Sequence, residues 1–453
     1  MDELFQALKQ LTLTVKKMIE ESISKGTLKP REEEYFRWKV EKFQYTDKGV
    51  TESSAHGQYF TKQSWFRTTE KIEESIKQHS GYASALEHLT DVFGKSDKLS
   101  LDLEYFIGKL IHQYLYNLKI EEKDIDSLIT AFLKDLREEP VKYGAKVELQ
   151  GVALQLEKIE PSFGMILRQT KIEDIEREFP VYRFFMMPQH LPNPSAILTI
   201  EFLGRGSNEI QKRVEQAIAI LRLFKVGSVE WTTYRTTSES VTDIEASGAT
   251  SYRRMGAPLE TYLITQEETQ KLKKFWRTMS DSIPGSFFWA DATGTNYLTI
   301  AYKRYSDALL ENGLLERRIA NAVMGLEALF LKAGETQELP YRLRVRSGKL
   351  FSLLGYNPHE ITKIINDAYK VRNLFAHGGQ LSCKAKKKLG SKYKDVRNLL
   401  SSVLDYLRTS IIAMILSNRE KDEFIDLVDD SLIDRKQEEQ LNGIISQAKE
   451  VIR

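Results

Sequence analysis

Apolar residues recur at helical spacing in three segments of the first 140 residues: 2–25, 101–118 and 125–136. Such spacing predicts amphipathic helices, each with one side turned to a core. Residues 45–77 are polar with scattered aromatic side chains, a pattern that favours only a loop or short strands. The first 140 residues are therefore expected to form a mostly helical N-terminal region.

From Lys146 the pattern changes to alternation of apolar and polar residues, which is typical of strands. Residues 147–156 predict one long strand, and residues 164–168 predict its hairpin partner. The same pattern, with one amphipathic helix that bears Val214 and Ile218, predicts further strands over residues 196–202, 230–237 and 261–265. Residues 141–290 are thus expected to form a small α+β domain. We assign it to recognition or scaffolding, because it shows no catalytic constellation.

Two glycines, Gly204 and Gly206, join one of these strands to the helix that follows. Glycines between a strand and a helix are typical of phosphate-binding loops. The third glycine and the Lys-Ser/Thr pair of such loops are missing, so a plain turn with Ser207 or Asn208 as helix N-cap is the better interpretation. The sequence therefore gives no support to a nucleotide-dependent enzyme.

Everything after Tyr297 has helical periodicity. One long helix buries Leu315, Ile319, Ala322 and Leu326 on one side, and later segments repeat the pattern. We expect residues 291–453 to form a helical bundle. The predicted fold class is a multidomain, mostly α, α+β protein with regions 1–140, 141–290 and 291–453.

Composition and charge narrow the class of protein. The chain has 453 residues, of which 41% are hydrophobic and 29% charged, as in ordinary soluble proteins. Its net charge of +2 is near neutral, so nucleic-acid binding would need local basic patches. Cys383 is the only cysteine, which excludes an intrachain disulfide and a multi-cysteine metal site. No uncharged apolar run approaches the roughly 18 residues of a membrane span, so we expect a cytoplasmic protein without membrane contact, metal or cofactor.

The stretch 367–379 combines an apolar helix stripe with unusual polar residues. Arg372 falls on the stripe between Ala368 and Phe375, where a cation is costly unless it is paired or faces a polar cavity. Gly378 is the residue type expected just past a helix end, so His377 is predicted on the last turn. The plain alternative is that Arg372 pairs with a core carboxylate and His377 merely helps to end the helix.

The motif Arg372-Asn373-Leu374-Phe375-Ala376-His377 resembles the R-x(4–6)-H signature of the HEPN superfamily. Its flanks are similar to the Apea-like branch: the helix over 316–330, the Arg-rich segment at Leu343-Arg344-Val345 and the Ala-His-Gly-Gly ending. A short R-x4-H match alone is common, but the match in this helical context is more specific. The resemblance covers residues 300–420 closely and residues 145–300 more loosely.

This resemblance implies a metal-independent endoribonuclease, often a toxin or an anti-phage (abortive infection) defence protein. His377 would take the proton of a ribose 2′-hydroxyl, since imidazole ordinarily titrates near pH ~6.5. Arg372 would stabilise the charge that gathers on the attacked phosphate. Asn373 would hold His377 or a phosphate oxygen. The resemblance also implies pairing of two copies through the HEPN domain. A single chain offers one Arg and one His, which also favours a site shared by a homodimer.

Other charged residues complete the predicted site. Glu327 lies among apolar neighbours and is either the partner of Arg372 or a carboxylate at the rim of the bundle. The basic residues expected to bind RNA phosphates share a helix face or follow the motif directly: Arg342, Arg346, Lys349, Lys384, Lys386, Lys387 and Lys388. The alternative for the basic run after residue 383 is a solvated surface.

Two classes of function thus remain open. The first is an active HEPN ribonuclease whose residues 1–290 sense an unknown trigger and restrain the nuclease. The second is a catalytically inactive HEPN module that binds nucleic acid or scaffolds a complex. Retention of Arg372, Asn373 and His377 together favours the first.

Overall fold

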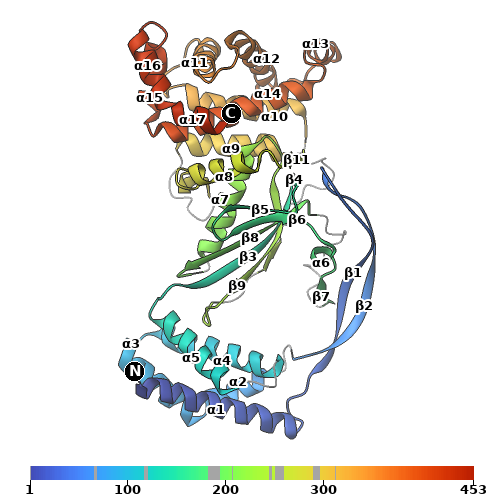
Figure 1. The fold of residues 1–453 in the computed structure, drawn as a ribbon, viewed down its shortest axis with the longest axis vertical. Helices are drawn as coiled ribbons and strands as arrows, with labels where there is room; N and C mark the ends of the chain where they lie inside the picture. The colour runs from blue at the N-terminus through green and yellow to red at the C-terminus, as the bar shows by residue number, and fades with distance from the viewer. Residues whose placement is uncertain are drawn as a thin grey trace.

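The computed structural model describes residues 2–65, 69–116, 121–181, 194–206, 208–243, 247–249, 260–288, 296–311 and 313–452. Within these ranges the chain is a mostly helical, multi-region α+β protein, as the sequence predicts. Three regions follow one another along the long axis of the molecule (Figure 1). N-terminal helices lie at one end, an antiparallel sheet lies in the middle, and C-terminal helices lie at the other end.

The N-terminal bundle consists of helices α1 to α5 around a core of its own. Helix α1 buries Leu4, Leu8, Leu11 and Val15 because these residues recur every three or four positions on one face. Its neighbours close over that face. The helices are α1 (Asp2–Ser24), α2 (Glu70–Lys77), α3 (Ser80–Phe93), α4 (Asp97–Tyr116) and α5 (Glu122–Leu136).

A long antiparallel hairpin, here called the arm, joins α1 to α2. The prediction of a mostly helical N-terminal region with only a loop or short strands was therefore wrong for this segment. Strand β1 (Arg31–Thr46) pairs with β2 (Gly49–Ser64) over its full length. The arm runs from the N-terminal bundle along the side of the sheet (Figure 1). Both of its faces carry mixed aromatic and charged residues, so the sequence shows no clean alternation that would mark a strand.

The tip of the arm is fastened to the middle of the molecule. The Tyr45 hydroxyl donates to the carbonyl of Ser195 at 2.8 Å and accepts from the amide of Leu154 at 3.1 Å. Along its length, β1 also pairs with the short strand β7 (Glu178–Pro180). The arm therefore connects the N-terminal bundle to the sheet by backbone and side-chain hydrogen bonds.

The central sheet is antiparallel, in the order β10-β9-β3-β8-β6-β5. One face packs on α7 and α8 in a large core. A separate two-stranded sheet pairs β4 with β11. The elements are β3 (Val141–Gln150), β4 (Val152–Leu154), β5 (Lys158–Ser162), β6 (Met165–Gln169), α6 (Ile172–Ile175), β8 (Ala196–Gly204), α7 (Asn208–Phe224), β9 (Glu230–Ser238), β10 (Ser247–Ala249), β11 (Tyr262–Ile264), α8 (Thr269–Ser280) and the 3-10 turn η2 (Gly285–Phe287).

Two strand predictions were wrong in this region. The single strand expected over 147–156 is broken at Gly151, whose φ of +81° suits glycine and whose missing side chain leaves room for the carbonyl of Ser228. Beyond the break, β4 leaves the central sheet and pairs with β11. The expected hairpin partner, β6, pairs instead with β5 and β8. The other strands and helix α7 lie where the pattern predicted them; Ser207, one of the two expected N-caps, lies outside the described residues.

The C-terminal helical domain lies at the other end of the molecule from the N-terminal bundle (Figure 1). Its central helix α14 is long and apolar enough to cross a membrane, but 83% of that window is buried inside the protein. This burial is consistent with the core helix of a soluble protein. The helices are α9 (Tyr297–Leu310), α10 (Leu315–Phe330), α11 (Leu339–Leu353), α12 (Pro358–Ala376), α13 (Cys383–Tyr393), α14 (Val396–Ser417), α15 (Lys421–Asp430), α16 (Arg435–Ile444) and α17 (Ser446–Ile452).

The central sheet and the C-terminal helices share one hydrophobic core, which runs from β3 to α17. Polar contacts cross the same junction. The buried Arg408 donates to the carbonyls of Leu223 and Phe224 at the end of α7. The Tyr305 hydroxyl donates to the carbonyl of Arg222 at 2.8 Å. The described parts of residues 141–452 thus form one packed body, which we call the main body.

Candidate functional site

Helix α12 ends in a glycine-dependent turn that fixes the position of His377. The amide of Gly378 donates to the carbonyl of Phe375, and that of Gly379 donates to Leu374, both at 2.9 Å. This pair of bonds is a Schellman motif, which needs a left-handed residue just past the helix. Gly378 supplies it with φ +77°. His377 is therefore the C-cap residue, as the sequence predicted, and its side chain is exposed.

Arg372 lies one and a half turns earlier and is held by a carboxylate from α10. Its Nη2 donates to Oε2 of Glu327 at 3.0 Å, and its Nη1 donates to Oδ1 of Asn373 at 3.3 Å. The Arg372 side chain is 28% exposed and that of Glu327 is 14% exposed. Of the two roles expected for Glu327, pairing with Arg372 is therefore the one that the structure shows. The guanidinium thus lies at the edge of the bundle, partly open to water.

Tyr369 is a member of this cluster that the sequence analysis missed. It lies one turn before Arg372 on α12, and the Arg372 guanidinium stands 5.6 Å from the centre of its ring. Burial, together with the neighbouring carboxylate of Glu327 that accepts from the hydroxyl, raises the pKa of Tyr369 to about 12. The phenol therefore stays protonated and donates a hydrogen bond to Glu327 in addition to that from Arg372. Its spacing of three residues from Arg372 was the available signal.

The Asn373 side chain does not hold His377. Within the described part of the chain, the backbone amide of His377 donates to the carbonyl of Asn373 at 3.2 Å, but no side-chain hydrogen bond joins His377 to Arg372 or to Asn373. The Asn373 amide oxygen instead accepts from Arg372. Nε of Arg372 is buried and has no acceptor among the described residues. The site in one chain therefore consists of a positioned Arg372 and a separate, solvent-facing imidazole.

The basic helix α13 lies directly after this site and is tied down by two acids. The Lys386 ammonium is 3.1 Å from the buried carboxylate of Glu316 on α10. Asp367 of α12 accepts from Lys392 and, at 2.8 Å, from the hydroxyl of Tyr393. Although burial raises it, these two donors hold the pKa of Asp367 below its ordinary value. Asp367 precedes Arg372 by five residues, so α13 is fixed beside the motif helix (Figure 1).

The basic run divides into anchored and exposed members. No residue of α13 is buried, and Lys384, Lys387 and Lys388 are exposed on its surface. Lys386 is exposed as well, but its ammonium is paired with Glu316. The three other lysines are thus exposed to solvent, whereas Lys386 also helps to hold the helix in place.

The prediction of RNA contacts from α11 was wrong for Arg346. This side chain is 2% exposed, and its guanidinium donates to both oxygens of Glu335, both oxygens of Asp429 and the carbonyl of Phe330. A guanidinium with all its donors used inside the protein has none left for phosphate. Arg346 instead clamps α15 and the segment before α11 to the bundle.

The two neighbours of Arg346 on the same helix face are also engaged inside the protein. Lys349 is paired with Glu438 of α16 at 3.0 Å, and its side chain is only 13% exposed. Arg342 is paired with Glu335 at 3.0 Å and is 41% exposed. The face that carries these residues is therefore an internal ion-pair network, and only Arg342 retains substantial contact with solvent.

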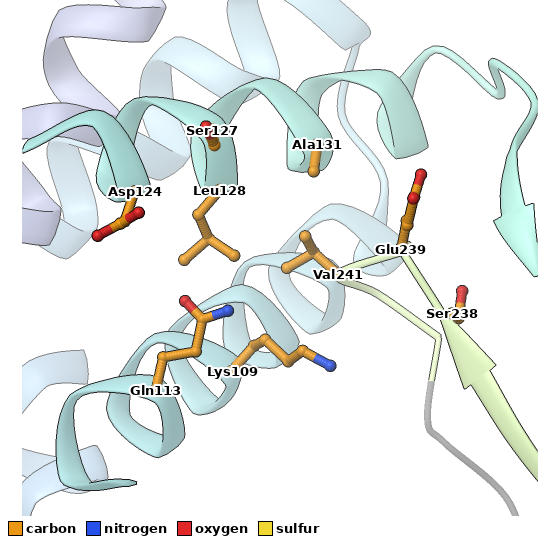
Figure 2. A pocket seen from close by; sticks show the side chains of 9 residues that line it. All are labelled: Lys109, Gln113, Asp124, Ser127, Leu128, Ala131, Ser238, Glu239 and Val241. Atoms are coloured by element: carbon orange, nitrogen blue, oxygen red, sulfur yellow. The ribbon is translucent and has the colours of Figure 1, made fainter. Parts of the chain in front are cut away.

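A cleft of about 490 Å³ lies far from this site, where the N-terminal bundle meets the end of β9 (Figure 2). Beside it, the carboxylate of Asp135 on α5 accepts from the amide of Val241 at 2.6 Å and from that of Thr242 at 3.1 Å. Val241 itself is buried in the core of the bundle. The cleft is lined by Lys109, Gln113, Asp124, Ser127, Leu128, Ala131, Ser238, Glu239 and Val241.

Neither a metal site nor a comparison with known proteins adds a residue to the candidate site. Among the residues that the structure describes, no group of three or more His, Cys, Asp or Glu side chains is arranged to hold a metal ion. No protein-family model matches the chain, and neither the curated proteins nor the solved structures contain a significant match. The candidate site therefore rests on its own residues and geometry.

Proposed function

We propose that this protein is a metal-independent endoribonuclease of the HEPN type. The observation that carries the proposal is the end of α12, where Glu327 holds Arg372 half-buried and the glycine turn presents His377 to solvent. Beside it lies a surface of exposed lysines on α13, held in place by Asp367 and Glu316. A fixed cation, an exposed imidazole and a phosphate-binding surface are the groups that RNA cleavage requires.

In this proposal His377 removes the proton of a ribose 2′-hydroxyl, and the resulting oxygen attacks the adjacent phosphorus. The bond to the 5′-oxygen of the next nucleotide breaks, and this leaving oxygen takes up a proton. One product strand then ends in a 2′,3′-cyclic phosphate. Arg372 stabilises the negative charge on the phosphate oxygens. General acid–base assistance of this kind accelerates a reaction by about 10²–10⁴.

The reaction also needs a proton donor for the leaving oxygen, and one chain supplies only one His377. We therefore propose that two copies pair through their C-terminal helical domains and share the site, since a two-fold interface places the same residues opposite each other. Leu374, a large apolar side chain that is 36% exposed at the end of α12, is suited to such a contact. Size-exclusion chromatography with light scattering is expected to show a dimer. A fully active monomer would contradict the shared site.

The RNA assay tests the proposal directly. Purified protein is expected to cut total cellular RNA in the presence of a chelator and to leave a 2′-deoxy substrate intact. His377→Ala and Arg372→Ala are expected to reduce cleavage by at least a hundredfold. His359→Ala, an exposed histidine at the start of the same helix, is the matched control and is expected to cleave normally. Cleavage of DNA, or an absolute need for Mg²⁺, would exclude the mechanism.

A second candidate function is a non-catalytic HEPN module that binds RNA or a partner protein. The ion pair with Glu327 favours it, because a neutralised guanidinium contributes less to charge stabilisation. Expression in a host cell separates the two. A cytoplasmic nuclease used in toxin or anti-phage defence slows growth of the host in a manner that His377→Ala abolishes, whereas a scaffold leaves growth unchanged with or without the substitution.

A further inference from the structure

Strand β2 is the outer edge of the arm. The sheet that contains the arm has the order β2-β1-β7, so β1 lies between the two other strands. Among the described residues, no backbone hydrogen bond other than those to β1 involves residues 51–63. In the view of Figure 1 the arm is also the outermost element on its side of the molecule. The outward-facing backbone groups of β2 are therefore open to a further strand.

The composition of β2 favours pairing of this edge. Edge strands are ordinarily protected by charged side chains, by proline or by short length. Strand β2 has 16 residues and no proline, and its charged residues are only Glu52 and Lys62, with His56 between them. The inner strand β1, by contrast, carries eight charged residues. Tyr59 places a large ring, 61% exposed, on the outer strand. The charges thus lie on the strand that is already paired, and the edge itself is left unprotected.

The sequence of β2 complements itself when it is reversed about Gly57. A two-fold axis perpendicular to the sheet at Gly57 places residues equally distant from it, on its two sides, opposite each other in two chains. Lys62 of one chain then lies opposite Glu52 of the other. Bulky side chains meet small ones and hydroxyls meet hydroxyls: Tyr59 opposite Ala55, Phe60 opposite Ser54, and Thr61 opposite Ser53. Opposite charges and side chains of matched size stabilise antiparallel neighbours, whose Cβ atoms lie about 5 Å apart.

We propose that β2 pairs with β2 of a second copy of this chain, antiparallel and centred on Gly57. The two arms then form one continuous sheet in the order β7-β1-β2-β2-β1-β7. From Glu52 to Ser64 each residue of β2 has its own partner on β1, so the edge is regular over the whole paired length. Moving the axis by one residue in either direction separates Lys62 from Glu52. The charges therefore select this register.

The two charged residues have room for the added contact. Among the described residues, Glu52 has no ion-pair partner. Lys62 already contacts Glu178 of β7, which Arg37 also approaches at 3.8 Å. An ammonium group has three donors, so Lys62 keeps Glu178 while it meets a second carboxylate. Both side chains are exposed, and their pairing contributes mainly to the choice of register.

This contact is separate from pairing through the C-terminal helical domains. The arm lies along the side of the molecule, between the N-terminal bundle at one end and the C-terminal helices at the other (Figure 1). Antiparallel pairing of two arms reverses the partner, so the two C-terminal domains lie at opposite ends of the pair. A chain that makes both contacts therefore links dimers into larger assemblies. The arm contact does not depend on the proposed nuclease activity.

Engineered cysteines in the full-length protein test the register. In a Cys383→Ser background, Ser53→Cys combined with Thr61→Cys places two thiols opposite two thiols across the axis. The two positions are too far apart along one strand to join within a chain. Mild oxidation is expected to give a covalent dimer on non-reducing electrophoresis. Ser54→Cys combined with Thr61→Cys is the matched control. Its thiols lie on opposite faces of the strand and out of register, so it is expected to cross-link at least tenfold more slowly.

Charge reversal tests the Lys62–Glu52 pair. Glu52→Lys, added to the in-register cysteine variant, is expected to slow cross-linking severalfold, because like charges then face each other at both ends of the pairing. Glu34→Lys is the matched reversal on the inner strand, and His377→Ala alters only the proposed nuclease site. Both are expected to leave cross-linking unchanged. Without cysteine changes, light scattering is expected to show larger species than the C-terminal dimer at high protein concentration, and fewer of them for Glu52→Lys.

Three outcomes would overturn the proposal. The first is no covalent dimer from an in-register variant whose circular dichroism and thermal stability match those of the wild-type protein. The second is equal cross-linking of the in-register and out-of-register variants, which would indicate random collision. The third is a cross-linking rate that Glu52→Lys leaves unchanged. Because His377→Ala retains the arm, failure of the nuclease proposal leaves each of these results as it is.

Discussion

Arg372 shows how a cation is retained on the apolar side of a helix. Its neighbours Ala368 and Val371 are fully buried, so an unpaired guanidinium there would be costly. Glu327 provides the opposite charge, and Tyr369 provides a hydrogen-bond donor to Glu327 and an aromatic ring beside the guanidinium. The three side chains limit the orientations open to Arg372. Such positioning is what a charge-stabilising group needs before substrate binds.

Removal of the Tyr369 hydroxyl is expected to loosen this arrangement without unfolding the bundle. In Tyr369→Phe, Glu327 loses one hydrogen bond and Arg372 keeps its ion pair, so the loss of stability is about 1 kcal/mol. RNA cleavage is expected to fall about tenfold through kcat, with little change in KM, because the ground-state contacts to RNA lie elsewhere. Single-turnover kinetics measure the two effects separately.

Tyr341→Phe is the matched control, since this tyrosine is 56% exposed on α11. If Tyr369→Phe raised KM and left kcat unchanged, the hydroxyl would act in RNA binding and not in positioning Arg372. Loss of activity that follows the loss of thermal stability in both variants would indicate only a structural role.

The sequence predicts the site residues well where spacing alone determines them. Gly378 and His377 end the helix as expected, and the apolar setting of Glu327 left two roles open, of which the structure shows the pairing with Arg372. Tyr369 was missed because an aromatic residue on the apolar face of a helix ordinarily packs in the hydrophobic core. Arg346 was misassigned because helical spacing shows which residues share a face, but not that Glu335 and Asp429, 11 and 83 residues away, lie over that face.

At the scale of elements, the Arg346 clamp joins three segments of the C-terminal helical domain. Glu335 precedes α11, and Asp429 ends α15, so the guanidinium crosses between them inside the bundle. The hydrogen bond from Arg346 outweighs burial and lowers the pKa of Glu335 to about 2. The carboxylate is thus held in its charged form by the fold.

This shift predicts the sign of a pH effect. A carboxyl group with a depressed pKa stabilises the fold above its unfolded-state pKa, and loses that effect as pH falls through the folded-state value. Wild-type protein is expected to exceed Glu335→Gln in stability by about 2 kcal/mol at pH 7. The difference is expected to narrow between pH 4.5 and about 2. Urea unfolding of both proteins, followed by circular dichroism across this range, measures it.

Glu420→Gln, an exposed residue before α15, serves as the control and is expected to match wild type at every pH. A difference between wild type and Glu335→Gln that stayed constant down to pH 2 would show that the charge of Glu335 does not contribute to stability.

Helix α13 carries a separate prediction about RNA. Replacing Lys384, Lys387 and Lys388 together by Gln is expected to weaken RNA binding and to lower the slope of log affinity against log salt by up to about 2 units, since each phosphate contact on single-stranded RNA contributes about 0.7. Lys386→Gln is expected to act differently. It leaves Glu316 without its ion-pair partner, so α13 itself is expected to lose protection from hydrogen exchange.

Fluorescence anisotropy with a short RNA at several salt concentrations gives both the affinity and the slope. An equal number of exposed lysines on the N-terminal bundle provides the control: Lys17, Lys95 and Lys98. Equal effects of the two triple variants would mean that α13 is a solvated surface and that only overall charge matters.

Among the elements, the long helices α1, α4, α5 and α7 were predicted from their apolar faces, whereas the shorter α2, α3 and α8 were missed. The strands depended on what they pair with. The arm was missed because its two faces are similar in polarity, so β1 and β2 lack the alternation that marks a half-buried strand. The break at Gly151 was missed because the carbonyl of Ser228, which fills the space beside it, comes from 77 positions further along the chain. Local periodicity reveals neither the pairing of the two arm strands nor the approach of the distant Ser228 carbonyl.

At the scale of the whole molecule, the two hydrophobic cores determine which parts of the chain fold separately. A chain that starts at residue 291 keeps α9 to α17 but removes the sheet, α7 and α8 that share their core. It also removes the carbonyl partners of Arg408 and Tyr305. A chain that starts near Pro140 removes the N-terminal bundle, which has its own core, and the arm, which meets the main body through β7 and the hydrogen bonds of Tyr45.

The two truncations are therefore expected to differ. The chain that starts near Pro140 is expected to be soluble and cooperatively folded, and the chain that starts at 291 is expected to aggregate. If the N-terminal bundle restrains a nuclease, the first truncation is also expected to be more toxic in cells than the full-length protein, and His377→Ala is expected to remove the difference. Circular dichroism and growth curves measure the two effects. Equal toxicity of truncated and full-length protein would exclude restraint by the bundle.

The single core shared by the sheet and the C-terminal helices constrains how this gene can be reshuffled. A recombination event near codons 137–140 cuts little of either core, so a different N-terminal bundle can be joined there while the main body continues to fold. An event near codon 290 combines side chains from two different parent proteins in one hydrophobic core. These side chains were not selected to pack together, so the hybrid contains cavities and steric clashes. Natural exchange of modules, and laboratory libraries built by fragment swapping, are thus expected to yield folded chains at the first joint and few at the second.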